Sequence, residues 1–234
     1  MNALCIIPAR AGSKGVKNKN LREVAGKPLI SYIIESALKT KYPIRVIVST
    51  ESEKIAEVAK RYGAEVPFLR PHELAEDHIS LIPVAQHALK TMDGLGFRAD
   101  AVVSLQPTSP LIATDDIDNA VKLFIDSGCD SVVSVERIDK HHPFRAYKIE
   151  GDRLFPLTEY TSERYLQRQD RPPAYGFTGA IYVRKRDLLE NWNGNDFCLG
   201  RDVRYIVIDK SRSINIDSEI DLEFFEYLIS KNKI

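Results

Sequence analysis

The chain has 234 residues, and its 33 lysines and arginines balance 33 aspartates and glutamates, which argues against broad attraction to nucleic acid. It contains neither an 18-residue apolar run nor the apolar core of a signal peptide, so we expect no membrane span and no secretion. Its cysteines (Cys5, Cys129, Cys198) lie far apart without a C-x-x-C pair, which disfavours structural zinc and disulfides and favours a reduced, cytoplasmic setting.

Strands and helices are predicted to alternate from residue 3 to residue 135. The predicted strands are short apolar runs, at 3–7, 46–48, 65–69, 101–105 and 131–135. The predicted helices have apolar residues at helical spacing and cover 27–38, 52–63, 79–92 and 114–128. This alternation predicts an α/β fold with a doubly wound, mostly parallel sheet covered on both faces. Ligands of such sheets bind beyond the carboxyl ends of the strands.

The alternation breaks at about residues 137–173, which are polar, aromatic and rich in turn residues, with a predicted hairpin at Glu150-Gly151-Asp152. Beyond it we expect a strand at 180–183, a helix near 187–192 and a strand at 205–208. The final helix is predicted to be amphipathic, with an apolar face formed by Ile220, Phe224, Tyr227 and Leu228. Because long insertions are usually functional or form interfaces, we expect one domain over 1–234 with an inserted arm.

The loop after the first predicted strand carries the strongest chemical signal. Residues 10–20 contain two glycines, one serine and four cations. Glycines allow successive N–H groups to point into one concavity, and the cations around it require an anionic ligand, for which a phosphate group is best suited. The loop matches neither the Walker A nor the dinucleotide-binding pattern. A solvated basic turn is the alternative interpretation.

Three other polar groups lie at the same predicted edge of the sheet. They are Arg70 to Asp77 followed by Ser80, Gln106 to Pro110, and Asn215 with Asp217. Asp217 is a candidate metal ligand, because Mg²⁺ prefers one or two carboxylates together with phosphate oxygens. Taken singly, each has a plainer explanation: Arg70 as a surface ion pair, Gln106 to Pro110 as a rigid turn, and Asp217 as a helix N-cap.

Together these segments resemble the CMP–sialic acid synthetases, the acylneuraminate cytidylyltransferase family, over nearly the whole chain. The matching motifs, in chain order, are Ile7 to Gly15, Lys19-Asn20-Leu21, Arg70-Pro71-x-Glu73-Leu74-Ala75, Leu105 to Pro110, His141-His142-Pro143, Arg168-Gln169 and Gly179 to Tyr182. The resemblance implies a Rossmann-like nucleotidyltransferase that moves CMP from CTP to a nine-carbon α-keto acid sugar and releases pyrophosphate. It also implies Mg²⁺ and a homodimer in which the arm is a dimerisation arm that helps complete the neighbour's site.

Motif matching also implies roles for individual residues. The nucleotide site would comprise Ala9, Arg10, Ser13, Lys14, Lys19, Asn20, Arg70, Ser80 and Gln106. The sugar side would comprise Gln106, Thr108, Ser109, Arg145, Arg168 and Tyr182, with Arg145 supplied by the partner subunit. The catalytic set would be Arg10 and Lys19 on the phosphates, with Asp217, or a water on the metal beside it, accepting the sugar proton. The metal ligands would be Asp217 and Asn215.

The chain departs from the family pattern at two positions. Asn215 and Thr178 stand where relatives usually carry aspartate and asparagine, which implies weaker metal binding or another acceptor such as legionaminic acid. The pair His141-His142 is interpreted as dimer packing in preference to a metal site. Two other functions stay open: a synthetase for an eight-carbon ulosonic acid, and a catalytically weak nucleotide-binding regulator, which Asn215 favours.

Overall fold

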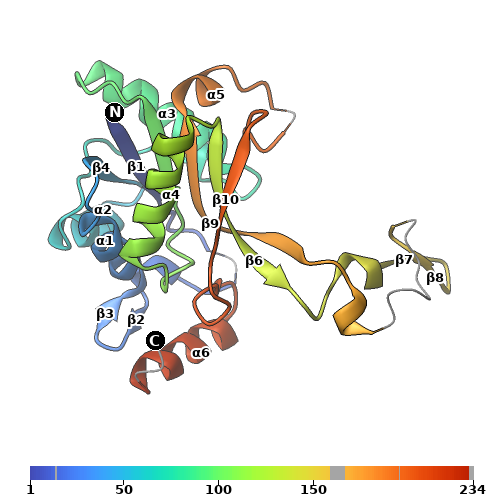
Figure 1. Ribbon diagram of the computed structural model, residues 1–234. Helices are drawn as coiled ribbons and strands as arrows, with labels where there is room; N and C mark the ends of the chain where they lie inside the picture. The colour runs from blue at the N-terminus through green and yellow to red at the C-terminus, as the bar shows by residue number, and fades with distance from the viewer. Residues whose placement is uncertain (14, 159–166, 195, 232–234) are drawn as a thin grey trace.

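The computed structural model describes residues 1–13, 15–158, 167–194 and 196–231. Its centre is a six-stranded sheet with strand order β10-β6-β9-β5-β1-β4 (Figure 1). The strands of this sheet are β1 (Ala3–Pro8), β4 (Ile44–Ser49), β5 (Ala101–Leu105), β6 (Ser131–Ile138), β9 (Ala174–Lys185) and β10 (Val203–Val207). All neighbours are parallel except β9, which runs antiparallel to both β5 and β6. The predicted mostly parallel sheet is therefore confirmed.

Helices cover both faces of the sheet, as predicted. The helices are α1 (Leu29–Leu38), α2 (Glu53–Arg61), α3 (Leu81–Gly94), α4 (Thr114–Ser127), α5 (Arg186–Glu190) and α6 (Glu219–Ser230). Alternate residues of β1 point to opposite faces. Cys5 and Ile7 pack with residues of α1, α2 and α4, whereas Leu4 and Ile6 pack with residues of α3 and α5. Because both faces are buried, β1 reads as a continuous apolar run.

Several predicted element boundaries are wrong, for local reasons. Lys27–Pro28 is not the first turn of a helix but β3, which pairs with β2 (Glu23–Val24), and α1 begins at Leu29. Residues 65–69 do not form a strand but make a single bridge between Ile47 and Glu65. Pro67, which has no N–H to donate, falls inside this run.

Helix ends follow the expected chemistry with small shifts. Ser52 caps α2 by accepting a hydrogen bond from the Ile55 amide, and Gly128 ends α4 with a φ of 64°, a conformation that favours glycine. Thr114 is the first residue of α4 and not its cap, and its hydroxyl donates to the Ser36 carbonyl. Helix α3 begins at Leu81, two residues later than predicted.

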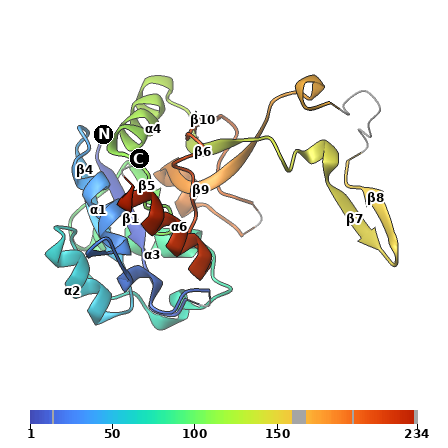
Figure 2. The same cartoon turned by 90° about the horizontal axis from the view of Figure 1, so that it is seen from below.

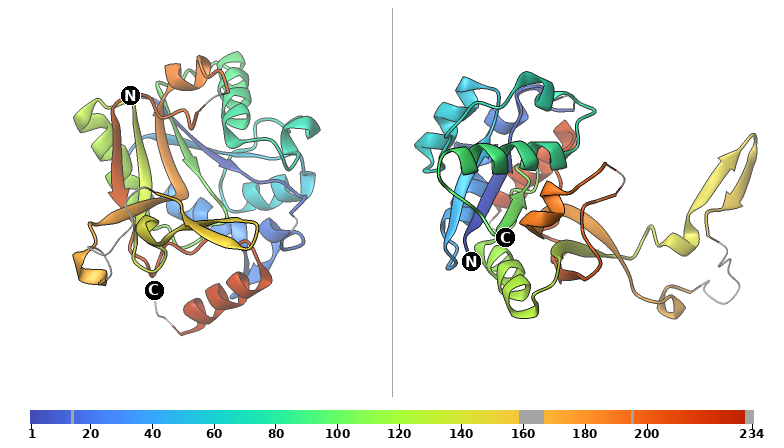
Figure 3. Two further views of the ribbon diagram at one scale, coloured as in Figure 1. Left: turned by 90° about the vertical axis from the view of Figure 1, so that its right-hand side faces the viewer. Right: turned by 90° about the horizontal axis from the view of Figure 1, so that it is seen from above.

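The insertion forms an arm that reaches away from the body, on the side opposite α1 and α2 (Figures 1 and 3). It leaves the sheet after β6 and returns in β9, and the described part contains η3 (Pro143–Arg145), β7 (Tyr147–Glu150), β8 (Arg153–Pro156) and η5 (Arg168–Asp170). The hairpin predicted at Glu150-Gly151-Asp152 is confirmed, because β7 and β8 pair antiparallel around it.

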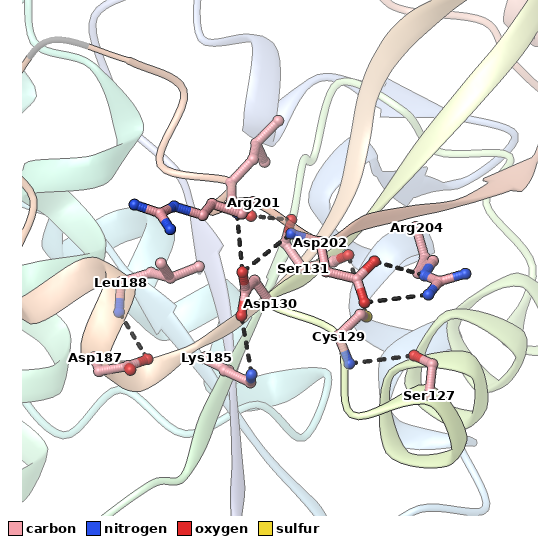
Figure 4. Close-up of polar contacts among 11 residues, drawn as sticks. Ser127, Cys129, Asp130, Ser131, Lys185, Asp187, Leu188, Arg201, Asp202 and Arg204 are labelled. Atoms are coloured by element: carbon pink, nitrogen blue, oxygen red, sulfur yellow. Dashed lines mark hydrogen bonds and ion pairs between the residues drawn. The ribbon is translucent and has the colours of Figure 1, made fainter.

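The edge strand β10 is held in place by one carboxylate (Figure 4). Asp130 accepts hydrogen bonds from the backbone amides of Arg201 (2.9 Å) and Asp202 (3.1 Å) and from Lys185 Nζ (2.9 Å). These bonds, with the Asp202 amide the largest cause, lower the pKa of Asp130 well below its ordinary value. Gly200 leaves room for this carboxylate, because a Cβ there would lie 2.5 Å from Asp130 Cβ.

Helix α6 lies beneath the body beside the small β2–β3 sheet (Figure 2). The predicted apolar face is correct only for Leu228, which packs against the body; Ile220, Phe224 and Tyr227 are exposed, and Leu222 and Phe225 are buried instead. The buried pair packs with Val24, Leu29 and Ile216, so the segment before α6 is drawn against the body. Within the described part of the chain, the helices are too short or too polar to cross a bilayer.

Candidate active site

A cleft of about 400 Å³ opens at the carboxyl ends of β1 and β5. Its walls come from the loop after β1, the segment 70–79, the start of α3, the turn after β5 and the segment before α6. It brings together eight of the predicted site residues: Arg10, Ser13, Lys19, Asn20, Arg70, Gln106, Thr108 and Asp217. Lys14 lies outside the described residues.

The loop after β1 is anchored to distant parts of the chain. Asn20 is buried, and its side-chain amide donates to the Arg10 carbonyl at 2.9 Å. Gly15 lies against Asp217, whose carbonyl oxygen would be only 1.8 Å from a Cβ at position 15. Only glycine allows this approach, so Gly15 brings the loop and the segment before α6 together.

Each of three cations in the cleft is paired with a carboxylate. Arg10 Nη1 lies 2.6 Å from Asp77 Oδ1, Lys19 Nζ lies 3.2 Å from Asp217 Oδ1, and Arg70 Nη2 lies 2.8 Å from Glu51 Oε2. Lys19 also donates to the Ile216 carbonyl at 2.6 Å. The Lys19 side chain is 12% exposed, so a solvated basic turn does not describe this loop.

Arg70 forms a buried ion pair, not a surface one. Its side chain is 3% exposed, and among the described residues its Nε–H has no hydrogen-bond partner. The nearby His87 imidazole is half-buried, and burial, followed by the charge of Arg70, lowers its pKa. His87 therefore stays neutral beside Arg70.

Asn215 and Asp217 are adjacent, as their spacing predicts. Asn215 Nδ2 donates to Asp217 Oδ2 at 2.6 Å, so the amide presents its nitrogen to the carboxylate. Asp217 does not cap α6; Ser218 does, with its hydroxyl accepting from the Asp221 amide. The described residues contain no cluster of three or more His, Cys, Asp or Glu that could hold a metal by themselves. One carboxylate facing a phosphate-sized cleft suits Mg²⁺ that is carried by a nucleotide.

Four predicted site residues are not among those that line the cleft. Ala9 is buried at the end of β1, Ser80 is the N-terminal boundary of α3, and Ser109 is buried in the turn after Gln106. Tyr182 lies on β9 opposite Ser104, with its ring 4.2 Å from the Arg184 guanidinium. Burial raises the pKa of the Tyr182 phenol, so this side chain offers a neutral hydroxyl.

Arg145 and Arg168 lie on the arm and not in the cleft. Arg145 ends η3 and is exposed. Arg168 begins η5 and pairs with Asp139 at 3.0 Å. Because the arm reaches away from the body, η3 and η5 lie apart from the loop after β1 (Figure 3).

The paired histidines behave differently from each other. His141 is exposed, whereas His142 is buried within the arm. His142 Nδ1 accepts from the Phe144 amide at 3.2 Å, which leaves Nε2–H to donate to the Pro172 carbonyl at 2.9 Å. His142 therefore joins the outgoing and returning segments of the arm inside one chain.

Thr178 does not present a free hydroxyl toward a ligand. Its Oγ1 lies 2.6 Å from Ser134 Oγ and also accepts from the Ala180 amide. These contacts lie where the pairing of β6 with β9 shifts register. Thr178 thus maintains an irregularity in the sheet next to Gly179, whose φ is +74°.

The sequence patterns assign no role in the site to Glu51 or to Asp77. Both are acids that pair with cations of the cleft. Glu51 lies two residues beyond the carboxyl end of β4, where parallel sheets carry ligand-binding groups, and this position could have identified it. Asp77 was seen in the segment after Arg70, but its contact with Arg10 depends on the tertiary fold.

Comparison with known proteins places these features in a family. The sequence model described as Cytidylyltransferase matches residues 4–191. The chain is 36% identical over 235 residues to the CMP-N,N'-diacetyllegionaminic acid synthase of Legionella pneumophila, covering 100% of this chain and 98% of the relative. It is 33% identical over 233 residues to the pseudaminic acid cytidylyltransferase of Campylobacter jejuni, covering 99% of this chain and 98% of the relative.

A solved structure shares the fold. The structure of CMP:2-keto-3-deoxy-manno-octonic acid synthetase complexed with CTP matches with a TM-score of 0.77 and 18% identity, covering 99% of this chain and 100% of that one. At 18% identity the match shows only that the two proteins share a fold.

Proposed function

Because this chain belongs to the cytidylyltransferase family, we propose that it transfers CMP from CTP to a nonulosonic acid and releases pyrophosphate. The observation that carries the proposal is one cleft that joins the loop bearing Arg10 and Lys19 to Gln106, Thr108 and Asp217. A triphosphate is bound by cations such as Arg10 and Lys19, and a polyhydroxylated acid is bound by amide and hydroxyl groups such as those of Gln106 and Thr108.

The nucleotide is proposed to lie along the loop after β1. Arg10 and Lys19 bind the phosphates, with Ser13, Lys14 and Asn20 adding contacts, while Ala9, Arg70 and Ser80 hold cytosine and ribose. Support comes from the partly buried cations Arg10 and Lys19 and from the buried Arg70, all of which line one cleft. Positive charge held at this place stabilises the leaving pyrophosphate.

The transfer step needs no covalent intermediate with the protein. The anomeric hydroxyl of the sugar attacks the α-phosphorus in line, an oxygen–phosphorus bond forms, and the bond to the bridging oxygen of pyrophosphate breaks. Asp217 accepts the hydroxyl proton. Positioning and electrostatic stabilisation supply most of the acceleration in such reactions.

We propose that Mg²⁺ arrives with CTP and is held on the protein side by Asp217, with Asn215 orienting that carboxylate through its amide. When bound, the ion neutralises negative charge on the triphosphate. The arrangement around Asp217 supports one protein carboxylate as ligand and no larger set within the described residues.

The sugar is proposed to be a nine-carbon acid similar to the legionaminic and pseudaminic acids that appear in the names of the two relatives above. Gln106, Thr108, Ser109 and Tyr182 border the space for it. We propose a cytoplasmic reaction, because Cys5, Cys129 and Cys198 are all buried free thiols, as suits a reducing compartment.

Pyrophosphate release tests this function. The enzyme is incubated with Mg²⁺, CTP and one of a panel of acceptors: sialic, legionaminic and pseudaminic acids and an eight-carbon ulosonic acid. Release with a nine-carbon acid is expected. Release with the eight-carbon acid alone would establish the rival synthetase, and CTP binding without release for any acceptor would establish the regulator.

We further propose a homodimer. The β7–β8 hairpin is two-stranded and exposes Ile149, Leu154 and Leu157 at 74%, 66% and 63%. An isolated two-stranded hairpin is marginally stable in water, so this one requires a covering surface. A second apolar area lies on the sheet, at Tyr175, Phe177, Val203, Tyr205 and Val207. In this arrangement Arg145 and Arg168 of one protomer face the sugar in the cleft of the other.

Sedimentation equilibrium tests the dimer. The wild type is expected at twice the chain mass, and the double variant Ile149→Glu, Leu154→Glu is expected to be monomeric and poorly active. Asp152→Lys at the hairpin tip is the control and should remain dimeric. A monomeric wild type, or a dimeric double variant, would contradict this proposal.

A further inference from the structure

Glu51 connects the loop after β1 to Arg70. Its Oε1 accepts a hydrogen bond from the Ala11 backbone amide at 2.6 Å, and its Oε2 accepts one from Arg70 Nη2 at 2.8 Å. Ala11 belongs to the loop after β1, and Arg70 begins the segment 70–79 that forms another wall of the cleft. The Glu51 side chain is 8% exposed and that of Arg70 is 3% exposed. One buried carboxylate therefore contacts both the loop proposed to bind phosphate and the guanidinium proposed to bind the nucleoside.

The surrounding backbone holds Glu51 in this position. It lies two residues after the end of β4, and the carbonyl of the intervening Thr50 accepts from the Arg70 amide at 2.8 Å. On the other side, the Ala9 amide donates to the Ser49 carbonyl at 3.0 Å. The end of β4 thus lies between the loop and Arg70, so the side chain that follows it can set the spacing between them.

The chemistry of these contacts requires a carboxylate. Both partners of Glu51 are donors, and a carboxylate offers an acceptor oxygen to each. A glutamine has one acceptor oxygen and one NH₂ group. Its NH₂ would face either the Ala11 amide or the Arg70 guanidinium, and in both cases two donors would meet in a buried place. An aspartate is one methylene shorter and cannot span the same gap.

We propose that Glu51 is a positioning residue that sets the distance between the triphosphate site and the nucleoside site. It contacts no substrate itself. It acts by holding Ala11, and with it the loop that carries Arg10, at a fixed place relative to Arg70. CTP can then contact the loop with its phosphates and Arg70 with its nucleoside at the same time. This inference rests on the proposed function, because it takes CTP to be the ligand of the cleft.

Glu51→Gln is the test, with Glu53→Gln as the matched control. Glu53 is an exposed glutamate in the first turn of α2, outside the cleft. CTP binding is measured by titration calorimetry with Mg²⁺, and KM and kcat are measured for CTP and for the sugar. Glu51→Gln is expected to weaken CTP binding by on the order of tenfold or more, since a charged buried contact is lost. KM for the sugar and all constants of Glu53→Gln should stay within about twofold of wild type.

The coupling to Arg70 is measured with a double-mutant cycle. Losses from Glu51→Gln and Arg70→Met are expected not to add, because both interrupt the same connection. Full additivity, or a CTP affinity of Glu51→Gln within twofold of wild type, would overturn the inference. A wild type that does not bind CTP would instead overturn the proposed function, so the two failures are distinguishable.

A second measurement needs no variant at position 51 and covers the case in which Glu51→Gln does not fold. In the unliganded wild type, the Ala11 amide is expected to exchange with deuterium more slowly than the exposed Gly12 amide, as read by NMR. Arg70→Met should accelerate exchange at Ala11 through the loss of order in Glu51. Equal exchange at Ala11 and Gly12 in the wild type would contradict the proposed contact.

Discussion

Lys19 and Asp217, which are almost two hundred positions apart in the sequence, meet in the cleft with Nζ 3.2 Å from Oδ1. The same ammonium group donates to the Ile216 carbonyl at 2.6 Å. The pair joins the loop after β1 to the segment before α6, and so joins the proposed phosphate-binding cation to the proposed proton acceptor. The Asp217 side chain is 69% exposed, which leaves it accessible to a substrate.

Asp217→Asn is expected to lower kcat by about a hundredfold or more, because an amide cannot accept the hydroxyl proton and general-base catalysis contributes on that scale. Turnover is measured at saturating CTP, sugar and Mg²⁺. The control is Glu219→Gln, an exposed acid two residues further along that pairs with Arg22, and its kcat should stay within about twofold of wild type. Near-native turnover of Asp217→Asn at saturating Mg²⁺ would show that the proton goes elsewhere.

Gly15→Ala is expected to reduce kcat/KM by more than about a hundredfold, because misplacing reacting groups by an ångström has effects of that size. The added Cβ would lie 1.8 Å from the Asp217 carbonyl oxygen, so the loop and the segment before α6 must separate. Gly12→Ala provides the control in the same loop, since its Cβ would have no atom within 4 Å. The measurement is the steady-state kcat/KM of both variants. Equal kcat/KM values would mean that Gly15 does not determine the distance between the loop after β1 and the segment before α6.

The parts of the fold that the sequence predicts correctly are those decided by neighbouring residues. The strand 3–7 is apolar throughout because both of its faces are covered, and Gly128 ends α4 because it tolerates a positive φ. The eight site residues that line the cleft were found in the same way, by their place after predicted strands or before the last helix. Parallel strands bring their carboxyl ends to one edge of the sheet, so residues that follow different strands in the sequence lie close together in the structure.

The parts that the sequence did not predict depend on contacts between distant residues. Regular spacing predicts an apolar face of α6 made of Ile220, Phe224, Tyr227 and Leu228. Of these four, Leu228 packs against the body, while packing with Val24 and Leu29 buries Leu222 and Phe225 in place of the others. The direction of β9 follows from its return out of the arm. Pairings such as Glu51 with Ala11 span 40 residues and leave no local pattern.

Asp77→Asn is expected to lower KM for CTP by about two- to fivefold. Asp77 pairs with Arg10 at 2.6 Å, and both side chains are partly exposed, at 41% and 33%. CTP phosphates must compete with this carboxylate for Arg10, and partly exposed ion pairs contribute up to about 1 kcal/mol. The measurement is KM for CTP at low and high salt, with a smaller gain expected at high salt because screening already weakens the pair.

Glu76→Gln is the control for this change, because Glu76 pairs with His78 and not with Arg10. Its KM for CTP should match that of wild type. A raised KM for Asp77→Asn would mean that Asp77 assists binding, for instance through the metal, and would contradict the competition described here.

Asp130→Asn is expected to destabilise the protein at neutral pH, and the loss should shrink in acid. Asp130 accepts from two backbone amides and Lys185, which lowers its pKa in the folded protein below that in the unfolded chain. A lowered folded pKa contributes stability above the unfolded pKa of about 3.9, and this contribution is lost as the pH falls through the folded pKa. Asparagine has no charge to lose, so the wild-type advantage must fade below about pH 4.

Urea unfolding of wild type and Asp130→Asn between pH 3 and pH 7 measures this difference. The control is Asp126→Asn on the surface of α4, where the carboxylate contacts the Lys122 side chain and no strand edge depends on it. Its unfolding midpoint should stay close to wild type at every pH, since an exposed helical ion pair contributes little. A constant gap between wild type and Asp130→Asn across this range would mean that Asp130 stabilises β10 through shape and not through its charge.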